Sequence, residues 1–304
     1  MRVLVAGASG FLGEAAVRAL AKGGHDAVGL VRSHAKGETV SAAGGTAVEG
    51  DILSIPSIIK AAEGCGALVH LAASATTVSR EVGQSVAAKV RVDGAYNLVA
   101  AARKVGAKRL VVGSGTWLHG DHPSPITERS TVKPTGNAMF NWQAERAALD
   151  ANKPGALEVV VVRPGMVYGD GGWFREMVDG IAAGTYRVPG SGANHWSPLH
   201  RDDCGPAFVA ALERGRAGEV YLAADDEPIR LRELADLVAD ARRAPHPAAQ
   251  SMEEAGREHG EATARHLAAN QEVSAAKLKG IGWAPRFRSS REGVPAVVAA
   301  MRQP

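Results

Sequence analysis

Three glycines spaced three residues apart near the N-terminus are the first candidates for a chemical role. Gly7, Gly10 and Gly13 lie in GASGFLG, directly after the apolar run VLVA. Glycine permits the tight turn that joins a strand to a helix, and it lets backbone N–H groups approach a pyrophosphate at the helix N-terminus. A plain strand–helix turn shows the same pattern. The loop alone leaves both interpretations open.

A basic residue follows the second apolar run. Arg32 comes directly after AVGLV, and Ser33, His34 and Lys36 follow it. At this place in a dinucleotide fold an acid binds the ribose hydroxyls of NAD, whereas the planar fork of an arginine matches the oxygens of a 2′-phosphate. An arginine here is also consistent with a solvated surface charge. We expect NADP as the cofactor, with NAD as the less favoured alternative.

A hydroxyl and an imidazole that can take part in proton transfer follow the fifth apolar run. GSGTWLHG contains Thr116 and His119, and a histidine titrates near neutral pH. Each residue has an ordinary alternative, since a turn threonine often bonds its own backbone and a histidine can pack as a neutral ring. Both are candidate catalytic residues on this evidence.

Strands and helices must alternate to position these residues. Short Val- and Leu-rich runs such as RVLVA, AVGLV, ALVHLA, RLVVG and LEVVVV alternate with Ala-rich helical segments. This rhythm predicts an α/β fold with a Rossmann-like, doubly wound parallel sheet over residues 1–165. Longer loops and helices follow, and they predict a smaller C-terminal α+β substrate lobe over residues 166–304, interwoven with the first. Ser251 and Glu254 have capping-box spacing and predict the start of a helix over 251–270.

The composition excludes several function classes. The 304 residues are 45% hydrophobic and carry a formal charge of +3 without long blocks of like charge, so neither nucleic acid nor a membrane surface is an expected partner. No apolar run reaches the roughly 18 residues of a membrane span. Cys65 and Cys204 fit no metal-ligand spacing, so we expect buried thiols, no metal site and a reducing, cytoplasmic setting.

Several phrases in a fixed order resemble one family. GASGFLG is followed by LVRS, EGDI, VHLAA, VVRPGMVYGDGG, SPLHRDD and IGWAPRF. Over almost the whole chain this order resembles the extended short-chain dehydrogenase/reductase family, the NAD(P)-dependent epimerase/dehydratase group. The resemblance implies a Rossmann-like domain that binds NAD(P), a C-terminal substrate lobe and an active site between them.

The resemblance also implies which residues contact the cofactor. Those expected at the pyrophosphate are Gly7, Ser9, Gly10, Phe11, Leu12 and Gly13. Those expected around adenine, ribose and nicotinamide are Asp51, Ile52, Leu71, Ala72, Ala73, Pro164, Gly165 and Val167. Asp51 has a second interpretation as the cap of the helix that follows it, and Ile52, Leu71 and Val167 also suit core packing.

The catalytic residues are where this chain departs from the resemblance. Family members use a Ser or Thr after the fifth strand, Tyr-x-x-x-Lys on the next helix, where positions four apart share a face, and an Asn on the helix before. In GNAMFNWQAERAAL, the register that we favour puts Met139 at the Tyr position and Gln143 at the Lys position. Gly115 stands at the Ser position and Arg91 at the Asn position. Residues 97–167 contain no tyrosine, so no register restores the motif.

Substitutions in the expected substrate region favour an apolar ligand. Nucleotide-sugar enzymes of the family carry an Arg where this chain has Trp196, and an indole cannot neutralise a diphosphate. Trp196, Met139 and Trp142 either line an apolar substrate pocket or belong to the core. Gln143 can hold a ribose hydroxyl of the cofactor, and with Thr116 and His119 it completes the set of candidate catalytic residues.

We therefore expect an NADP-dependent oxidoreductase that acts on a carbonyl or alcohol of a small, mostly apolar metabolite with a non-standard active site. One alternative is an epimerase, dehydratase or cyclase that retains NAD(P) without net redox chemistry. Another is an NADP-sensing protein that turns nothing over. The family often dimerises through the two helices expected here at 84–105 and 137–151, so a homodimer is an open expectation.

Overall fold

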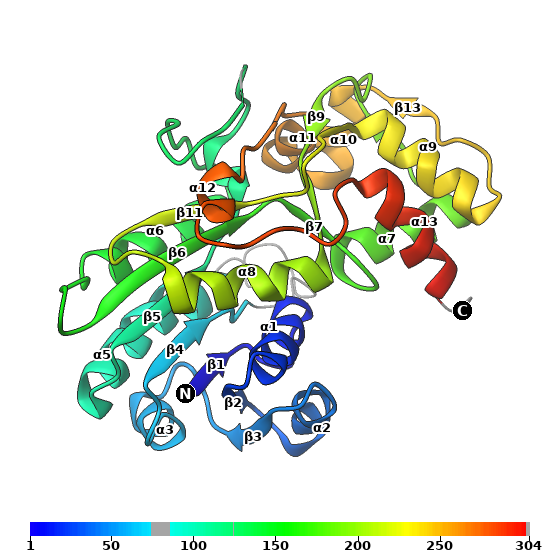
Figure 1. The fold of residues 1–304 in the computed structure, drawn as a ribbon. Helices are drawn as coiled ribbons and strands as arrows, with labels where there is room; N and C mark the ends of the chain where they lie inside the picture. The colour runs from blue at the N-terminus through cyan, green and yellow to red at the C-terminus, as the bar shows by residue number, and fades with distance from the viewer. Residues whose placement is uncertain (74–85, 124, 302–304) are drawn as a thin grey trace.

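A seven-stranded parallel sheet forms the centre of the computed structural model, which describes residues 1–73, 86–123 and 125–301 (Figure 1). The strand order is β3-β2-β1-β4-β5-β6-β11. The strands are β1 Arg2–Ala6, β2 Asp26–Val31, β3 Thr46–Glu49, β4 Ala67–His70, β5 Arg109–Gly113, β6 Glu158–Pro164 and β11 Val220–Ala223. The order reverses between β1 and β4, and ligands of such sheets bind in the crevice at that point, beyond the carboxyl ends of the strands. The predicted Rossmann-like fold is confirmed.

Helices cover both faces of the sheet because its buried strands are apolar on both sides. One face holds α1 Phe11–Lys22, α2 His34–Ala42 and α8 Arg201–Arg214, and the other holds α3 Ile55–Ala61, α5 Gly94–Val105 and α6 Ala138–Leu149. Along β1, Val3 and Val5 belong to the first core whereas Leu4 and Ala6 belong to the second. Two short helices, η1 Lys89–Asp93 of π type and η2 Thr116–His119 of 3₁₀ type, precede α5 and follow β5.

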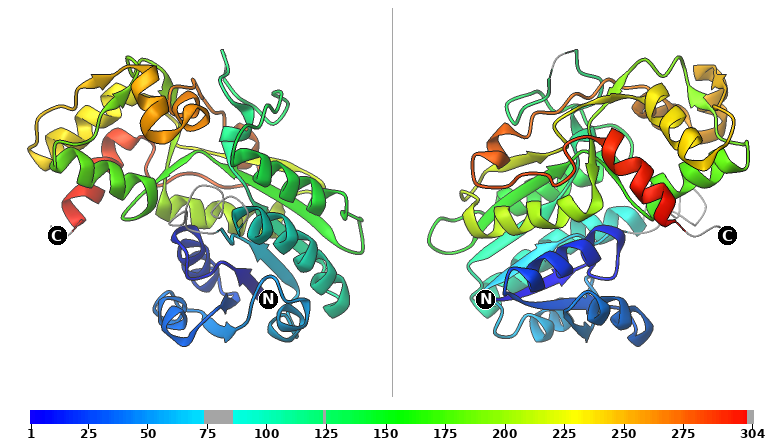
Figure 2. Two further views of the ribbon diagram at one scale, coloured as in Figure 1. Left: turned by 180° about the vertical axis from the view of Figure 1, so that it is seen from behind. Right: turned by 45° about the vertical axis from the view of Figure 1, so that its right-hand side comes forward.

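A second lobe lies beyond the carboxyl ends of the main strands (Figure 2). Its helices are α7 Gly172–Ala182, α9 Leu231–Arg242, α10 Met252–His259, α11 Glu261–Leu267, α12 Ala276–Lys279 and α13 Ser290–Ala300. Its strands are β7 Met166–Tyr168, β8 Val188–Pro189, β9 His195–Trp196, β10 Pro198–His200, β12 Ile229–Arg230 and β13 Ala249–Gln250. They pair as β7 with β10, β8 with β13 and β9 with β12. Between these elements α8 and β11 return to the main sheet, so the two lobes are interwoven.

Local signals explain where some helices start and stop. The predicted capping box is confirmed, since the Ser251 amide donates to Glu254 Oε2 at 2.8 Å and the Glu254 amide donates to Ser251 Oγ at 3.2 Å. The helix expected over 251–270 is instead two helices, because Gly260 adopts φ +85° between α10 and α11. The helix expected at 84–105 begins outside the described residues, and its described part includes the π-helical turn η1.

Two further sequence expectations concern the cysteines and the membrane. Cys65 and Cys204 are free and buried, as expected for small packed thiols. Within the described ranges, the helices are too short or too polar to cross a lipid bilayer.

Candidate functional site

The glycine loop between β1 and α1 is packed so tightly that side chains do not fit. Gly7 has φ +85°, and a Cβ there would lie 2.6 Å from the Ala72 backbone. A Cβ on Gly13 would lie 1.9 Å from the Gly7 carbonyl oxygen. The N–H groups in the first turn of a helix have no intrahelical acceptor. Gly10, the N-cap of α1, has no side chain that could accept a hydrogen bond from them, so they stay open. Open N–H groups at a helix N-terminus suit a pyrophosphate.

The start of α1 is held by the first residue of α8 and by the turn before α7. The Arg201 guanidinium lies over the Phe11 ring at 4.9 Å, and its Nε donates to the Phe11 carbonyl at 2.7 Å. Arg201 also forms an ion pair with Glu14 at 2.5 Å. A Cβ on Gly171 would lie 2.9 Å from the Phe11 ring. These contacts fix the start of α1 against α8 and against the turn before α7, so a ligand on the glycine loop lies where α1 meets the second lobe.

The two polar residues expected near the adenosine behave differently. Arg32 directly follows β2, is exposed, and forms no ion pair with a described residue, so its guanidinium is available to a ligand. Asp51 is exposed, and its Oδ1 accepts a hydrogen bond from the Leu53 amide at 2.9 Å. The alternative that Asp51 caps the next helix is wrong, because Ser54 is the N-cap of α3 and accepts from the Ser57 amide.

The other expected cofactor residues lie at the carboxyl ends of the strands. Leu71 and Ala72 follow β4, and their backbone lies so close to Gly7 that a Cβ on this glycine would overlap it; Ala73 beside them is exposed. Pro164 ends β6, and a Cβ on Gly165 would lie 2.1 Å from the Ser197 carbonyl of the second lobe. The remaining members of the expected set are placed by burial: Ile52 and Val167 are buried, and Ser9 and Leu12 are half-buried.

Helix α6 carries one exposed stripe of side chains. Met139, Gln143, Arg146 and Asp150 are all exposed, and Arg146 pairs with Asp150 at 2.7 Å. Positions three and four apart share a helix face, so Met139 and Gln143 lie on the same outer face as this surface ion pair. The structure therefore does not support the expected register, with Met139 on the substrate and Gln143 on the cofactor. Without a tyrosine or lysine, the sequence held no residue to fix that register.

The inward face of α6 carries two polar residues among buried alanines. Asn141 and Glu145 are 4% and 0% exposed, whereas Asn137, four residues before Asn141, is the exposed N-cap of the helix. The buried Oδ1 of Asn141 accepts no hydrogen bond from a described residue. Buried polar groups are almost always paired in native proteins, so an open amide oxygen on this face points to a missing partner. Asn137 and Asn141 have the four-residue spacing of the Tyr and Lys positions, and of the two only Asn141 is buried on the inward face.

Glu145 anchors that face to the end of β6. Its carboxylate accepts two hydrogen bonds from Arg163, at 2.9 Å from Nε and 2.6 Å from Nη2. Arg163 Nη1 donates to His119 Nε2 at 3.1 Å, and His119 Nδ1 donates to the Thr131 carbonyl at 3.1 Å. Neither Glu145 nor Arg163 was a sequence candidate, although EVVVVRP placed an arginine at the end of a buried strand.

This network argues against His119 as a proton donor. The ring is fully buried, and both nitrogens are occupied by the bonds to Arg163 and Thr131. Burial, and next the positive charge of Arg163, lower the pKa of His119 to about 4. The imidazole is therefore neutral at pH 7 and serves to orient the arginine.

The two tryptophans expected at the substrate lie in different surroundings. Trp142 is half-buried, with the guanidinium carbons of Arg146 and Arg163 at 5.9 and 6.0 Å from its ring centroid. Trp196 is 3% exposed, meets Trp173 edge-on at 5.6 Å and donates from Nε1 to the Leu267 carbonyl. Trp196 is therefore a core residue of the second lobe, which is the alternative interpretation of the sequence.

Further polar groups gather at the carboxyl ends of β4 and β5. Thr116 in η2 is buried, and its hydroxyl forms no hydrogen bond with a described residue. The buried Ser114 Oγ likewise has no partner among the described residues. Arg91 lies in η1, which packs against α6, and forms no ion pair within the described chain. His70 Nε2 donates to the Arg91 carbonyl at 3.0 Å and ties η1 to β4.

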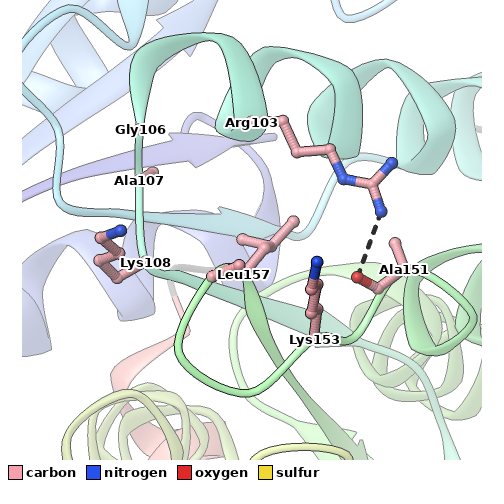
Figure 3. A pocket seen from close by; sticks show the side chains of 8 residues that line it. Arg103, Gly106, Ala107, Lys108, Ala151, Lys153 and Leu157 are labelled. Atoms are coloured by element: carbon pink, nitrogen blue, oxygen red, sulfur yellow. Dashed lines mark hydrogen bonds between the residues drawn. The ribbon is translucent and has the colours of Figure 1, made fainter.

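A shallow cavity of about 170 Å³ lies elsewhere on the molecule (Figure 3). Arg103, Lys108 and Lys153 line it, and Arg103 donates to the Ala151 carbonyl at 3.3 Å. These residues lie at the ends of α5 and α6 and near the starts of β5 and β6. The cavity is therefore at the amino-terminal ends of the strands, whereas the glycine loop is at the carboxyl end of β1. It is separate from the candidate site.

Known proteins resemble both the sequence and the fold. The sequence model of the NAD dependent epimerase/dehydratase family matches residues 3–224. The chain is 30% identical to a Stigmatella aurantiaca 4-hydroxy-2-methyl-3-oxo-4-farnesyl-3,4-dihydroquinoline-1-oxide ketoreductase, covering 80% of this chain and 73% of that protein. It is also 30% identical to a 3-diazoavenalumate denitrifying reductase of a Streptomyces species, covering 97% and 99%.

The fold has a solved counterpart at similar coverage. A Streptomyces venezuelae dTDP-glucose 4,6-dehydratase, solved with NAD bound, superposes with a TM-score of 0.84 at 25% identity. The match covers 98% of this chain and 96% of that one.

Proposed function

Because the chain belongs to the NAD-dependent epimerase/dehydratase family, we propose that it is an NADPH-dependent reductase of a carbonyl in a small, mostly apolar metabolite. The observation that carries the assignment of a dinucleotide cofactor is the glycine loop, whose packing against Ala72 and open helix N-terminus fit a pyrophosphate. The NADP preference rests on the exposed Arg32, which forms no ion pair with a described residue. A ketoreductase among the relatives supports the reaction type.

The chain's own residues then have distinct tasks. A bound nicotinamide cofactor supplies the hydrogen that is transferred to the substrate. The inward amide of Asn141 holds a ribose hydroxyl in place of the family's lysine, because its Oδ1 is buried and open. The hydrogen bonds that Arg163 forms with Glu145 and His119 hold α6 in a fixed position along β6. The buried Thr116 hydroxyl, which has no partner in the described chain, is a further hydrogen-bond donor after β5, and water provides the proton.

A second candidate reaction needs no protein acid at all. Hydride transfer to the terminal nitrogen of an aryldiazonium group gives an aryldiazene, and dinitrogen leaves as the N–H hydrogen passes to the aryl carbon. The relative named as a 3-diazoavenalumate denitrifying reductase aligns from end to end with this chain. The absence of a tyrosine and a lysine on α6 favours this candidate, because such chemistry does not use them.

Cofactor binding and turnover test the proposal separately. Calorimetry with NADPH compares wild type with Gly10→Val, where a side chain would lie in the pyrophosphate site. Gly66→Val is the matched control, because a Cβ there meets only the Met1 sulfur at 3.8 Å. We expect binding to be lost in Gly10→Val and kept in Gly66→Val.

NADPH oxidation is then followed with acetophenone, 3-oxohexanoate and a benzenediazonium salt; binding without oxidation of NADPH by any acceptor contradicts the reductase assignment.

A further inference from the structure

Gly115 is a glycine for a reason of space and not of backbone conformation. Its φ of −169° and ψ of 154° are extended values that any residue adopts. A Cβ built on Gly115, however, would lie 2.0 Å from Nε1 and 2.3 Å from Cδ1 of Trp117. The indole of Trp117 therefore fills the space into which a side chain at position 115 would project.

This geometry puts a hydrogen-bond donor where the family has one. Position 115 corresponds to the Ser or Thr that follows β5 in the resemblance, and a serine Oγ lies one covalent bond beyond its Cβ. The Nε1 of Trp117 lies within the volume of that missing side chain. The indole N–H has thus taken the place of the hydroxyl.

The N–H group is open, and the ring that carries it is held in place. Trp117 is 37% exposed, and its Nε1 donates to no described residue. Its ring stacks on His266 of α11, with centroids 4.9 Å apart and an interplanar angle of 26°. His266 is uncharged at neutral pH, because burial lowers its pKa to about 4. The stack joins the turn after β5 to the second lobe, so the N–H lies at the junction of the lobes.

We propose that the indole N–H of Trp117 donates the hydrogen bond that holds the reacting oxygen of the substrate. The inference rests on the proposed reductase function and names the group that recognises the acceptor. An indole is a donor only and releases no proton at neutral pH. Trp117 therefore stabilises negative charge on the oxygen as hydrogen reaches the carbon, and water supplies the proton that completes the alcohol.

The role of Trp117 restricts the substrate to acceptors that bear an oxygen at the reacting centre. A single donor aimed at a developing oxyanion is worth about 10²–10³-fold in rate. A diazo acceptor has no such oxygen and does not gain from the N–H. The effect of removing the N–H thus separates the carbonyl candidate from the diazo candidate.

The decisive variants exchange one donor for another. Trp117→Phe keeps a ring to stack on His266 and removes the N–H, and we expect kcat/KM for ketones to fall about 10²-fold with NADPH affinity unchanged. Trp117→Ala with Gly115→Ser vacates the space and restores a hydroxyl. Trp117→Ala with Gly115→Ala is its matched control without the hydroxyl. We expect the serine double variant to recover activity over the alanine one; equal rates for these two, or a wild-type rate for Trp117→Phe, overturn the assignment.

A binding measurement keeps the inference testable without turnover. NADP⁺ cannot reduce a ketone, so wild type with NADP⁺ and acetophenone forms a stable ternary complex. The indole ¹H–¹⁵N resonance missing from Trp117→Phe identifies Trp117, and we expect it to move downfield when the ketone is added. A shift without any turnover keeps the inference and rejects the reductase function. An unmoved resonance while acetophenone binds rejects the inference.

Discussion

Arg32 is the residue on which the choice between NADP and NAD depends. Its guanidinium is exposed after β2 without an ion pair in the described chain, so a 2′-phosphate would meet a free planar donor. We expect Arg32→Ala to weaken NADPH binding by about 1.5–3 kcal/mol, the usual value of a charged hydrogen bond, and to leave NADH binding unchanged. Calorimetry with both cofactors measures this, with Lys36→Ala, at an exposed position in the first turn of α2, as a matched loss of charge. A similar loss for NADPH and NADH would show that Arg32 does not contact the phosphate.

At the residue scale, the sequence predicted the glycines that are required where two backbone segments approach closely. It missed the roles of side chains that are set by tertiary contacts. Gly7 and Gly13 are required by close backbone approach, which a glycine in a strand–helix turn already indicates. His119 was expected to be a proton donor because imidazole titrates near pH 7. Its neutral state comes from burial and next from the charge of Arg163, which is 44 residues away in sequence. The residues next to His119 in the sequence do not indicate that Arg163 is its partner.

At the scale of the element, α6 depends on the pair between Glu145 and Arg163. Both side chains are at most 4% exposed, so removing one charge leaves the other buried and unpaired. We expect Glu145→Gln to lower the free energy of unfolding by about 3 kcal/mol. Asp150→Asn on the exposed stripe of the same helix breaks a surface ion pair and serves as the control, with an expected loss below about 0.5 kcal/mol. Urea unfolding of both variants checks this; a loss in Glu145→Gln no larger than in the control would contradict it.

The strands and helices were largely predictable from the sequence, whereas the side of α6 that faces the protein interior was not. Runs such as LEVVVV can only be buried strands, because they are apolar on both faces. The inward stripe of α6 contains Asn141 and Glu145, and its outward stripe contains Met139. The alanines of α6 mark the inward face, but these three residues run against the hydrophobic pattern. The buried ion pair with Arg163 decides it, and this contact forms only when β6 lies beside the helix.

At the scale of the whole molecule, burial of ionisable groups makes stability depend on pH in two directions. Burial lowers the pKa of His70, His119 and His266 from 6.5 to about 4. As the pH falls below 6.5 the unfolded chain takes up protons that the folded chain refuses, so these three imidazoles reduce stability towards pH 4. Well above pH 6.5 these imidazoles are neutral in both the folded and the unfolded chain, and they no longer change the free energy of unfolding with pH.

Asp225 acts in the opposite direction and in a different window. It follows β11, is 3% exposed, and lies beside His200, Tyr168 and Asp203 where the two lobes meet. Burial raises its pKa from 3.8 to about 8, so the folded chain keeps a proton that the unfolded chain has lost. Its contribution is complete below about pH 4 and is lost as the pH rises to 8, at up to about 1.4 kcal/mol per pH unit.

Between about pH 7.5 and 8.5 the histidines are almost entirely neutral in both the folded and the unfolded chain, so Asp225 sets the slope among these groups. We expect the free energy of unfolding of wild type to fall across this window and that of Asp225→Asn to stay level, because an amide has no proton to lose. Urea unfolding at about pH 7.5, 8.0 and 8.5 measures both. Asp226→Asn is the control, since Lys279 and Arg288 hold the pKa of that neighbouring carboxyl below its usual range and it stays ionised throughout. A slope that survives in Asp225→Asn would assign the titration to another group at the lobe junction.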